Sequence, residues 1–588
     1  MGAGILIRDT VFWTTPGTGI NITWANQATY DEVTDANGDV TDTGEALSTA
    51  QVATVRTLLG AYSDVSNLTF TEVNPGGTSD EAVMLFAAYD SEADGAGAYA
   101  NFPGSTSFDN EAGDVRLNND SVSQTSIPQG SYSYWAIMHE IGHAMGLDHP
   151  GDYNAEEGVD IVYETSAQFT QDSLQYSIMS YFEADNTTAD PGSYPDTLML
   201  YDILAIQQAY GANMSTRAGN SIYGFGANTG ATYDFTVNTR PALCIWDGGG
   251  TDTINASGFS ANQKIDLRAG AFSDINGIAA NVSIAFGAVI EKATGGSGND
   301  TLIGNAVNNT LAGGAGSDTY YVQNTGDVLV EAKGKGTDTV FSTVSFVLKS
   351  GVYVENLTLT GSGDLNATGN GIANTLTGNA GVNVLTGGAG EDRMIGGKGD
   401  DTYYVDDKDD VVIEAKGSGT GTDRVYASSD YSIVGQYVEY LTLTGSADVY
   451  AKGNGIDNRL VGNTGDNRIN GMGGQDRLTG GGGADTFIWD ATSHSKVNDS
   501  DRIVDLSSND VIDLSRIDAN VNVGGTQHFT LVDAFTNTAG QVMLDYDAST
   551  KVTSLTADTN GDGVADMLVR ITGDHDDRFR LYPIAREN

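Results

Sequence analysis

The stretch Tyr134–Pro150, YWAIMHEIGHAMGLDHP, decides how the first part of this chain folds and what chemistry it can support. It carries three of the protein's six histidines and one glutamate, Glu140. His139 and His143 are four residues apart, so on a helix they lie one turn above each other on the same face. Two imidazoles placed in this way can bind one metal ion.

The residues after the second histidine extend this pattern. Gly146 can end the helix in a left-handed conformation, which returns His149 towards the first two histidines. The full pattern H-E-x-x-H-x-x-G-x-x-H supplies three neutral imidazoles and leaves a fourth position open, as in a catalytic zinc site rather than a closed structural one. The alternative is an amphipathic core helix that happens to carry histidines, and the spaced glycine and third histidine disfavour it.

A second motif, SIMSY at Ser177–Tyr181, follows further along the chain. Here the sequence resembles the metzincin zinc metalloproteases, whose Met-turn underlies the zinc site. The tyrosine and the repeats described below narrow the resemblance to the serralysin family (peptidase M10B type) with RTX calcium-binding repeats. The resemblance implies one catalytic zinc ion, with Glu140 as general base, Tyr181 as a catalytic residue and Met179 as a scaffold residue. The zinc ligands that it implies are His139, His143, His149 and Tyr181.

The composition sets wider limits. At 588 residues the chain is too long for one core and predicts at least two domains. A formal net charge of -50 argues against nucleic-acid or anionic-membrane binding and makes the compact state self-repelling unless cations neutralise it. We therefore expect many carboxylates to bind calcium; the alternative is a merely soluble, acidic surface. Cys244 is the single cysteine, so no intramolecular disulfide can form. We expect the protein to be a monomer.

The residues before the zinc helix predict a small twisted sheet packed on two helices, an α+β half-domain. Strands are expected over 21–24, 67–73, 82–88, 97–102 and 114–117, and a helix after the capping box Ser48-x-x-Gln51. The resemblance implies that the strand 97–102 forms the sheet edge above the cleft, where an extended substrate adds as a further strand. The residues alone leave an internal strand equally open. A helix over 197–210 closes this domain near residue 215.

Two glycine-rich stretches follow the catalytic domain, RAGNS at 217–221 and DGGGTD at 247–252. On their own they predict glycine-rich turns. The resemblance implies that the two loops share a calcium ion. The candidate ligands that it implies are Arg217, Gly219, Ser221, Asp247, Gly249, Gly250 and Asp252.

From Gly295 onward the chain repeats with period nine. Eleven units G-x-x-x-x-[DN]-x-U-x form three blocks, which begin at Gly295, Gly369 and Gly453. Position eight is apolar or aromatic in every unit, which disfavours a flexible linker. The sixth positions are Asp300, Asn309, Asp318, Asn374, Asn383, Asp392, Asp401, Asn458, Asn467, Asp476 and Asp485.

This repeat predicts a parallel β-roll. Glycines make the tight turns, turn carbonyls and the sixth-position oxygen face an ion held between successive turns, and the apolar residue points inward. Asparagine brings no charge, so the five asparagine turns should bind calcium more weakly. The candidate calcium ligands in the repeats are Gly296, Gly298, Asp300, Asn309, Gly314, Gly316, Asp318, Asp392, Asp401, Asp476 and Asp485.

Longer units join the blocks and indicate an internal duplication. DTYYV at 318–322 recurs at 401–405, EAKG at 331–334 recurs at 414–417, and LTLTG at 357–361 recurs at 441–445. The last hundred residues resemble the capping β-domain of serralysins. Within them, ADTNGDGVAD at 557–566 is similar to an EF-hand loop but has Val569 where the bidentate glutamate would stand, so we expect a β-turn or at best a weak calcium site.

The first residues hold only a brief apolar run without a basic region, and no apolar stretch approaches the roughly eighteen residues that span a bilayer. We expect neither a signal peptide nor a membrane span. The resemblance implies an extracellular protein, exported through a type I secretion channel under the direction of an uncleaved C-terminal signal. It also implies protein and peptide substrates and allows for a proteinaceous inhibitor. The family's tail often ends in an acidic residue followed by apolar ones, whereas this chain ends YPIAREN.

The sequence thus predicts four parts: a metzincin protease domain over 1–215, a linking β segment with calcium loops over 216–290, an all-β RTX roll over 291–488, and a capping and secretion β-domain over 489–588. The expected function is a secreted zinc-dependent, calcium-stabilised endopeptidase of broad specificity. The alternative from another class is a calcium-dependent surface or adhesin-type RTX protein, in which the roll is the working part. A polysaccharide-modifying enzyme with the same tail would have no use for the zinc motif.

Overall fold

The computed structural model describes residues 6–7, 12–29, 33–34, 40–42, 44–90, 97–104, 111–153, 161–414, 416, 421–575, 580–582 and 584–585. Three features singled out above lie partly outside these residues: the apolar run at 1–6, the second EAKG copy and the chain end. The chain divides into two compact units, 1–330 and 331–588, which are described separately. Among the described residues, no helix is both long and apolar enough to cross a bilayer.

A five-stranded sheet with the order β4-β1-β5-β7-β6 organises the first part of unit one. Strands β4, β1, β5 and β7 run parallel, whereas β6 is antiparallel to β7 and is the last strand in the order. All five strands match those predicted from the sequence, and β6 lies at a sheet edge. Their bounds are β1 (Ile20–Asn26), β4 (Leu68–Glu72), β5 (Met84–Tyr89), β6 (Ala98–Ala100) and β7 (Val115–Asn118). A separate pair, β2 (Val33–Thr34) and β3 (Val40–Asp42), is antiparallel.

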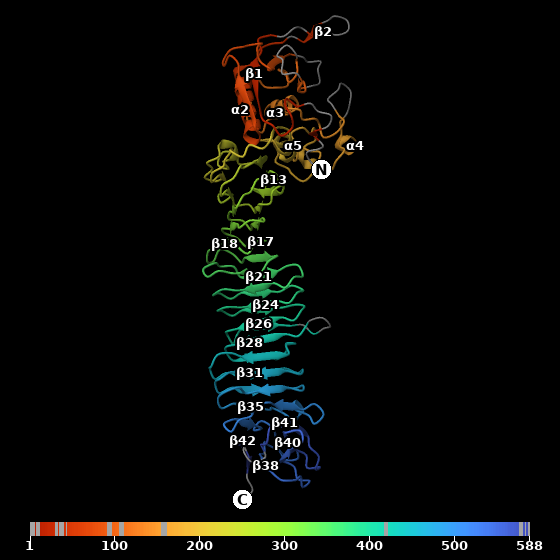
Figure 1. Ribbon diagram of the computed structural model, residues 1–588, viewed down its shortest axis with the longest axis vertical. Helices are drawn as coiled ribbons and strands as arrows, with labels where there is room; N and C mark the ends of the chain where they lie inside the picture. The colour runs from red at the N-terminus through yellow and green to blue at the C-terminus, as the bar shows by residue number, and fades with distance from the viewer. Residues whose placement is uncertain are drawn as a thin grey trace. The chain divides into compact units, whose positions relative to one another are not determined.

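Two helices, α2 (Thr49–Val65) and α3 (Tyr132–Ala144), pack on this sheet as predicted, and a third, α5 (Leu200–Tyr210), packs on α2 (Figure 1). Helix α2 begins at the predicted capping box, in which the backbone N of Gln51 donates to Ser48 Oγ at 3.2 Å and the backbone N of Ser48 donates to Gln51 Oε1 at 2.9 Å. Helix α2 contacts β4, α3 and α5, and α3 also contacts β6 and β7. The sequence predicted the end of α5, where Gly211 has φ 78°. The short helices are α4 (Tyr163–Ser166), η1 (Ala184–Asn186) and η2 (Ala231–Tyr233).

The rest of unit one is built from short strands in two series. In the first series all strands pair in parallel, in the order β8-β10-β14-β16-β18. The second runs β9-β13-β12-β11-β15-β17 and contains the antiparallel hairpin of β12 and β13. The bounds are β8 (Ile222–Gly224), β9 (Leu243–Ile245), β10 (Thr253–Asn255), β11 (Lys264–Asp266), β12 (Phe272–Ile275), β13 (Ile278–Ile284), β14 (Lys292–Thr294), β15 (Thr301–Ile303), β16 (Thr310–Ala312), β17 (Thr319–Val322) and β18 (Val328–Val330).

Unit two begins with a roll of short parallel strands, drawn as a ladder in Figure 1. Each strand pairs with the next strand but one, so that Leu376 lies opposite Met394 and Leu385 opposite Tyr403. Both pairs are eighteen residues apart (394 − 376 and 403 − 385), which is two nine-residue units per coil. Successive units therefore alternate between two sheets, and the position-eight side chains stack in a buried ladder within each sheet. This arrangement is the predicted parallel β-roll.

The roll strands of unit two have these bounds: β19 (Thr339–Ser342), β20 (Phe346–Val347), β21 (Asn356–Leu359), β22 (Asn366–Thr368), β23 (Thr375–Thr377), β24 (Val384–Thr386), β25 (Arg393–Ile395), β26 (Thr402–Val405), β27 (Val411–Ile413), β28 (Arg424–Ala427), β29 (Tyr431–Ser432), β30 (Tyr440–Leu443), β31 (Tyr450–Lys452), β32 (Arg459–Val461), β33 (Arg468–Asn470), β34 (Arg477–Thr479), β35 (Thr486–Ile488), β36 (Asp501–Ile503) and β37 (Val511–Asp513).

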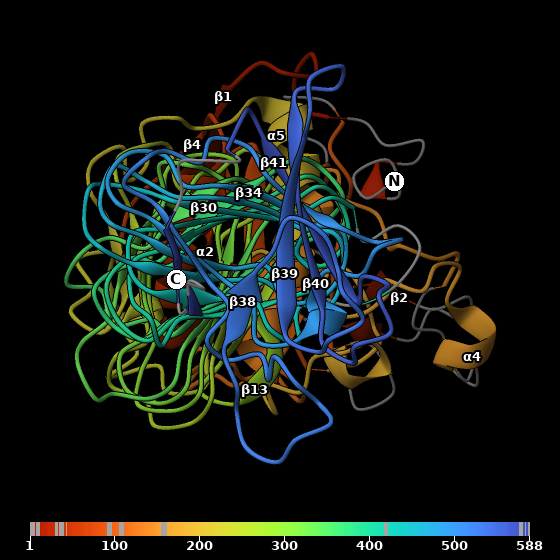
Figure 2. The same cartoon turned by 90° about the horizontal axis from the view of Figure 1, so that it is seen from below.

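The end of the chain adds antiparallel strands to the roll, which fits the predicted β cap. The long strands β39 and β40 lie side by side in Figure 2, and β41 pairs with both β40 and the roll strand β36. The run ADTNGDGVAD forms the turn between β40 and β41, as predicted, and Asp558 accepts the backbone N–H groups of Gly561 and Gly563. The bounds are η3 (Thr492–His494), β38 (Phe529–Leu531), β39 (Gln541–Asp547), β40 (Val552–Asp558), β41 (Met567–Thr572), β42 (Arg580–Tyr582) and β43 (Ile584–Ala585).

Candidate active site and metal-binding turns

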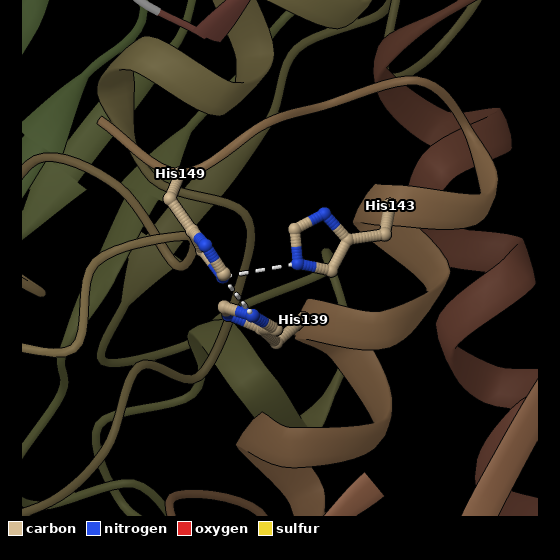
Figure 3. A group of neighbouring side chains, drawn as sticks. All are labelled: His139, His143 and His149. Atoms are coloured by element: carbon tan, nitrogen blue, oxygen red, sulfur yellow. Dashed lines mark hydrogen bonds between the residues drawn. The ribbon is translucent and has the colours of Figure 1, made fainter. Parts of the chain in front are cut away.

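Helix α3 carries the first two histidines in the interior of unit one. It begins at Ser131, whose hydroxyl accepts the backbone N–H of Tyr134, and every residue from Ser133 to Ala144 is buried. Beyond its C-terminus Gly146 has φ 91°, the left-handed conformation that the sequence predicted. This reversal brings His149 back to the helix (Figure 3).

The three imidazoles converge on one point. His149 Nε2 lies 3.1 Å from Nε2 of His139 and 3.1 Å from Nε2 of His143 (Figure 3). Zinc–nitrogen bonds of ~2.0–2.1 Å in a tetrahedral site place two ligand nitrogens roughly 3.3–3.4 Å apart. The triad therefore has nearly the spacing that a zinc ion requires.

Hydrogen bonds on the far side of two rings fix their orientation. His139 Nδ1 lies 2.8 Å from the carbonyl oxygen of Ile178, and His143 Nδ1 lies 2.7 Å from that of Leu147. A carbonyl oxygen can only accept, so Nδ1 carries the proton in both rings and Nε2 presents its lone pair to the common point. Such partners set the tautomer and orientation of metal-binding histidines.

Burial keeps these groups in the protonation states that a metal site needs. It lowers the pKa of His143 to about 3, with a further contribution from the neighbouring His149. It lowers the pKa of His139 well below its ordinary value, and His143 and His149 contribute. Burial also raises the pKa of Glu140 to about 8. The imidazoles are thus neutral ligands near pH 7, and Glu140 is a carboxyl that can hold and release a proton near neutrality.

The SIMSY turn packs against helix α3. Met179 is fully buried, and a Cβ atom added at Gly142 would lie 2.5 Å from its Sδ atom. The glycine between the two helical histidines therefore allows the turn to approach closely. Ile178 contributes the carbonyl that orients His139 and also accepts a hydrogen bond from Trp135 Nε1 at 2.8 Å.

Asp202 on α5 holds this turn in place, and sequence reasoning missed it. Its carboxylate is fully buried and accepts hydrogen bonds from Ser177 Oγ at 2.6 Å, the backbone N of Ile178 at 2.8 Å and the backbone N of Met199 at 2.9 Å. The available signal was a single acidic residue in the otherwise uncharged helix LYDILAIQQAY. Because Ile178 orients His139, Asp202 acts on the triad indirectly.

Tyr181 lies against the triad. Its ring centroid is 4.6 Å from that of His149 and 5.6 Å from that of His139. The triad, Glu140 and Tyr181 all line one cleft of about 530 Å³, together with Ala98 and Ala100 of β6. Because β6 is the edge strand, an extended chain in this cleft can lie along its backbone.

The two glycine-rich loops of unit one lie together. The backbone N of Ser221 donates to Asp252 Oδ1 at 2.7 Å, and a Cβ atom at Gly250 would collide with the carbonyl oxygen of Gly219. Asp252 Oδ2 is buried and accepts no hydrogen bond. The other predicted ligands belong to the same two loops: Arg217 has φ 50°, Gly249 has φ 137°, and Asp247 accepts the backbone N–H of Gly249 at 2.8 Å. Carboxylate and glycine carbonyl oxygens that belong to the same two loops are ligands that suit a calcium ion.

Turns of successive coils face one another in the first repeat block. A Cβ atom at Gly314 would collide with the carbonyl oxygen of Gly296, and one at Gly316 would collide with that of Gly298. Gly314 and Gly316 have φ 108° and 115°. The sixth-position Asp318 accepts the backbone N–H of Asp300 at 2.7 Å, so the two aspartates stand on adjacent coils.

Three of the four sixth-position aspartates of unit two leave one buried oxygen without a hydrogen bond. Oδ1 of Asp392, Asp401, Asp476 and Asp485 accepts the backbone N–H of the sixth residue one coil earlier, at 2.7 to 2.8 Å. Oδ2 of Asp392, Asp401 and Asp476 is buried and accepts no hydrogen bond. Burial is the main cause that raises the pKa of Asp392 to about 7 and of Asp476 to about 9. Such a site takes up either a proton or a cation.

The sixth-position asparagines are satisfied within the chain. Oδ1 of Asn383 accepts the backbone N–H of Asn379 at 2.8 Å, and its Nδ2 donates to the carbonyl oxygen of Leu365 at 2.8 Å. Asn374 and Asn458 make the same two kinds of bond. Asn309, a predicted ligand, accepts from the backbone N of Asn305 at 2.7 Å and donates to the carbonyl oxygen of Glu291 at 3.3 Å. In the asparagine turns the side-chain amide thus makes hydrogen bonds within the chain, whereas the aspartate turns leave a carboxylate oxygen without one. This difference fits the weaker calcium binding expected for the asparagine turns.

Comparison with known proteins gives two family matches. Residues 27–176 match the Matrixin family, and residues 212–363 and 336–579 match the family "Peptidase M10 serralysin C terminal". Serralysin B of Dickeya chrysanthemi is 42% identical over 304 residues, which cover 50% of this chain and 60% of the relative. Metallopeptidase AprA of Pseudomonas marginalis is 43% identical over 263 residues, which cover 43% of this chain and 54% of the relative. The chain thus spans little more than half the length of these curated relatives.

The family matches and the side chains of the two kinds of site indicate the same two metals. The family uses catalytic zinc and structural calcium, and the histidine triad and the open carboxylate oxygens have the donor types that these two ions prefer. With the serralysin C-terminal match spanning most of the chain and the matrixin match covering the zinc helix, the chain belongs to the serralysin family.

Proposed function

We propose that this protein is a zinc-dependent endopeptidase that hydrolyses peptide bonds of proteins with broad specificity. The observation that carries the proposal is the convergence of three histidines beside Glu140 in a cleft, where His149 Nε2 lies 3.1 Å from Nε2 of both His139 and His143. The three imidazoles would hold the ion, with Tyr181 as a further ligand. When bound, zinc supplies a Lewis acid that polarises a peptide carbonyl and makes water more acidic.

Two side chains handle protons and charge in this proposal. Glu140 takes a proton from the attacking water and returns it to the leaving amine nitrogen. Its pKa of about 8, raised by burial, suits both transfers because the group neither holds nor loses its proton too strongly near pH 7. Tyr181 turns its hydroxyl towards the oxygen on which negative charge develops.

The edge strand β6 accounts for the proposed breadth of specificity. A substrate that adds to β6 is held through backbone hydrogen bonds, which every peptide can make. Two exposed aromatic side chains, Tyr99 on the strand and Phe102 just after it, can cover the substrate without selecting one residue type.

We further infer that the protein acts outside the cell. The family, and an acidic roll that needs calcium, support export through a type I secretion channel from a calcium-poor cytosol. Proteins and peptides are the proposed substrates, and a proteinaceous inhibitor is a proposed partner. We also propose that the chain has the four parts expected from its sequence, with boundaries near residues 215, 290 and 488. The ordered histidine site argues against the adhesin alternative, which would leave that site without a use.

The test is the Glu140→Gln variant. Casein hydrolysis should fall by about 10²- to 10⁴-fold, the usual contribution of a general base, while one zinc ion per chain stays bound. Glu183→Gln is the matched control, because it removes a carboxylate from the same cleft and should retain activity. Full activity of Glu140→Gln would contradict the proposal, and loss of its zinc would contradict the assignment of Glu140 as base rather than ligand.

A further inference from the structure

One sheet of the roll in unit two carries a column of arginines. Arg459 on β32 lies opposite Arg477 on β34, and Arg477 lies opposite Arg502 on β36. Arg502 in turn lies opposite Arg570 on β41. These four residues are called the arginine column. The four strands pair in parallel, and because adjacent strands lie ~4.8 Å apart, the column extends over roughly 14 Å.

The side chains of the column point away from the core of the roll. In three of the four strands the next residue is a fully buried apolar residue: Leu460, Leu478 and Ile503. Successive side chains of a strand lie on opposite faces of the sheet, so the arginines lie on the outer face. Arg502 is half-buried, and the other three members of the column are exposed.

The positive charges of the column have no partner in the described part of the chain. The ion pairs found there involve other basic side chains. Arg502 Nε donates to Thr572 Oγ1 at 3.0 Å, and the other three guanidinium groups make no hydrogen bond to a described residue. Like charges directly opposite each other on a sheet are destabilising. The column is therefore unfavourable unless an anion lies along it.

The column is also unusual for this chain, which has 28 basic residues against 78 acidic ones. Arg459 and Arg477 occupy position seven of the nine-residue unit. The position-seven residues of the first two blocks are Thr301, Thr310, Thr319, Thr375, Val384, Arg393 and Thr402, with one arginine among seven. Arg502 and Arg570 lie beyond the last unit, so copying of the repeat does not explain why four arginines share one register.

Aromatic rings continue the column at one end. Tyr440 lies opposite Arg459, and the guanidinium of Arg424 on the next strand lies 5.1 Å from the ring centroid of Tyr440. Tyr426 stands two residues after Arg424, on the same face, and its ring stacks on that of Tyr404 with centroids 5.3 Å apart. This outer face thus offers cationic groups in a line and flat apolar rings beside them.

We propose that the arginine column binds a polyuronate, a linear acidic polysaccharide with a carboxylate on every sugar ring. The planar guanidinium of arginine pairs with a carboxylate through two parallel hydrogen bonds. A polyuronate repeats its charge once per ring, and long arginine side chains on successive strands can follow that repeat. Its rings also have apolar faces that can pack on tyrosine. The proposal does not depend on the proposed peptidase activity.

Other polyanions fit this surface less well. Duplex DNA carries one charge per ~1.7 Å of its axis, and a chain with a net charge of -50 would repel so dense a charge beyond the column. An anionic membrane needs a broad basic surface, whereas the column is one residue wide. A single thin strand of lower charge density meets the arginines and little of the surrounding acidic surface.

The test is isothermal titration calorimetry of the full-length protein at fixed calcium, with a hexamer of mannuronic acid as the probe. The wild type should bind it. The double variant Arg459→Gln/Arg477→Gln should raise the Kd by about 100-fold, roughly tenfold for each charged hydrogen-bond donor removed. The matched control is Arg468→Gln, which removes a position-seven arginine between these two from the other sheet and should keep the wild-type Kd. Absence of binding by the wild type, or an equal Kd for the double variant, would overturn the proposal.

Comparisons on the wild type cover the case in which the substitutions disturb folding. The hexamer of mannose, which has the same rings without carboxylates, should not bind, and equal binding of the two sugars would show that the arginines are not used. A hexamer of deoxythymidylate should bind more weakly than the uronate. Tighter binding of this oligonucleotide would assign the column to nucleic acid and overturn the proposal.

Discussion

The histidine triad of unit one and the aspartate turns of unit two are prepared for a cation in opposite ways. His139 and His143 are neutral, and backbone carbonyls fix both rings before any ion arrives. Asp392 and Asp476 instead keep one buried oxygen without a hydrogen bond, and burial raises their pKa values strongly. The triad is a site that is already ordered, whereas each aspartate turn is unfavourable until it is neutralised.

Because the two kinds of site differ in this way, we expect loss of zinc and loss of calcium to have different effects. Loss of zinc leaves three neutral imidazoles that still fit a packed interior, so the fold should survive while catalysis stops. Loss of calcium leaves negative charges on adjacent coils, whose repulsion opposes a compact roll. We therefore expect one metal to govern activity and the other to govern folding, as in metal sites whose binding is coupled to folding.

The largest expected effect is that of calcium removal. In a calcium chelator at neutral pH, amides of the roll strands β22 to β35 should lose their protection against hydrogen exchange, and millimolar calcium should restore it, as for extracellular modules with dissociation constants of roughly 10⁻⁴–10⁻³ M. Strands β1, β4 and β5 serve as the internal control and should stay protected. Unchanged protection of the roll in chelator would show that its apolar ladder alone holds it.

Next in size is the Tyr181→Phe variant, which tests the catalytic side of the comparison. Removal of the hydroxyl should lower kcat by about 10²- to 10³-fold, as loss of an oxyanion donor does, and should change KM much less. Steady-state kinetics on a peptide substrate gives both constants. A change confined to KM would mean that Tyr181 serves binding only.

A smaller effect is expected for Asp202→Asn, which tests whether the triad is ordered in advance. The amide cannot accept all three hydrogen bonds to Ser177 and to the backbone of Ile178 and Met199, so zinc affinity should fall by about 10- to 100-fold. Competition with a zinc chelator measures this, and Asp185→Asn, an exposed acid at η1, is the control. Unchanged affinity would mean that the turn does not need Asp202 to orient His139.

The smallest effect is a reversal of pH dependence in the roll. Folding raises the pKa of Asp392 from 3.8 to about 7 and of Asp476 from 3.8 to about 9, so the folded state binds these protons more tightly than the unfolded state. Without calcium, stability should therefore fall as pH rises from about 4 to 9. With calcium, stability should rise over the same range, because the ion needs ionised ligands. Urea midpoints at pH 5 and pH 8 measure both slopes, and equal signs would contradict this account.

Local patterns predicted much of this structure. The spacing of His139, His143 and His149 requires only a helix and one left-handed glycine, and the period of nine requires only that each unit make one turn and one strand. Contacts between distant segments were harder to foresee. Asp202 reaches the SIMSY turn from another helix, and the register of two units per coil depends on strand pairing, which the repeat alone does not specify.

The most direct test of the central claim removes one metal at a time from the same protein and follows casein hydrolysis and hydrogen exchange together. Removal of zinc alone should abolish hydrolysis and leave the protection of β22 to β35 unchanged, and restored zinc should return the activity. Removal of calcium alone should strip protection from the roll. Hydrolysis that persists in zinc-free protein would contradict the assignment of His139, His143 and His149 as the catalytic zinc site.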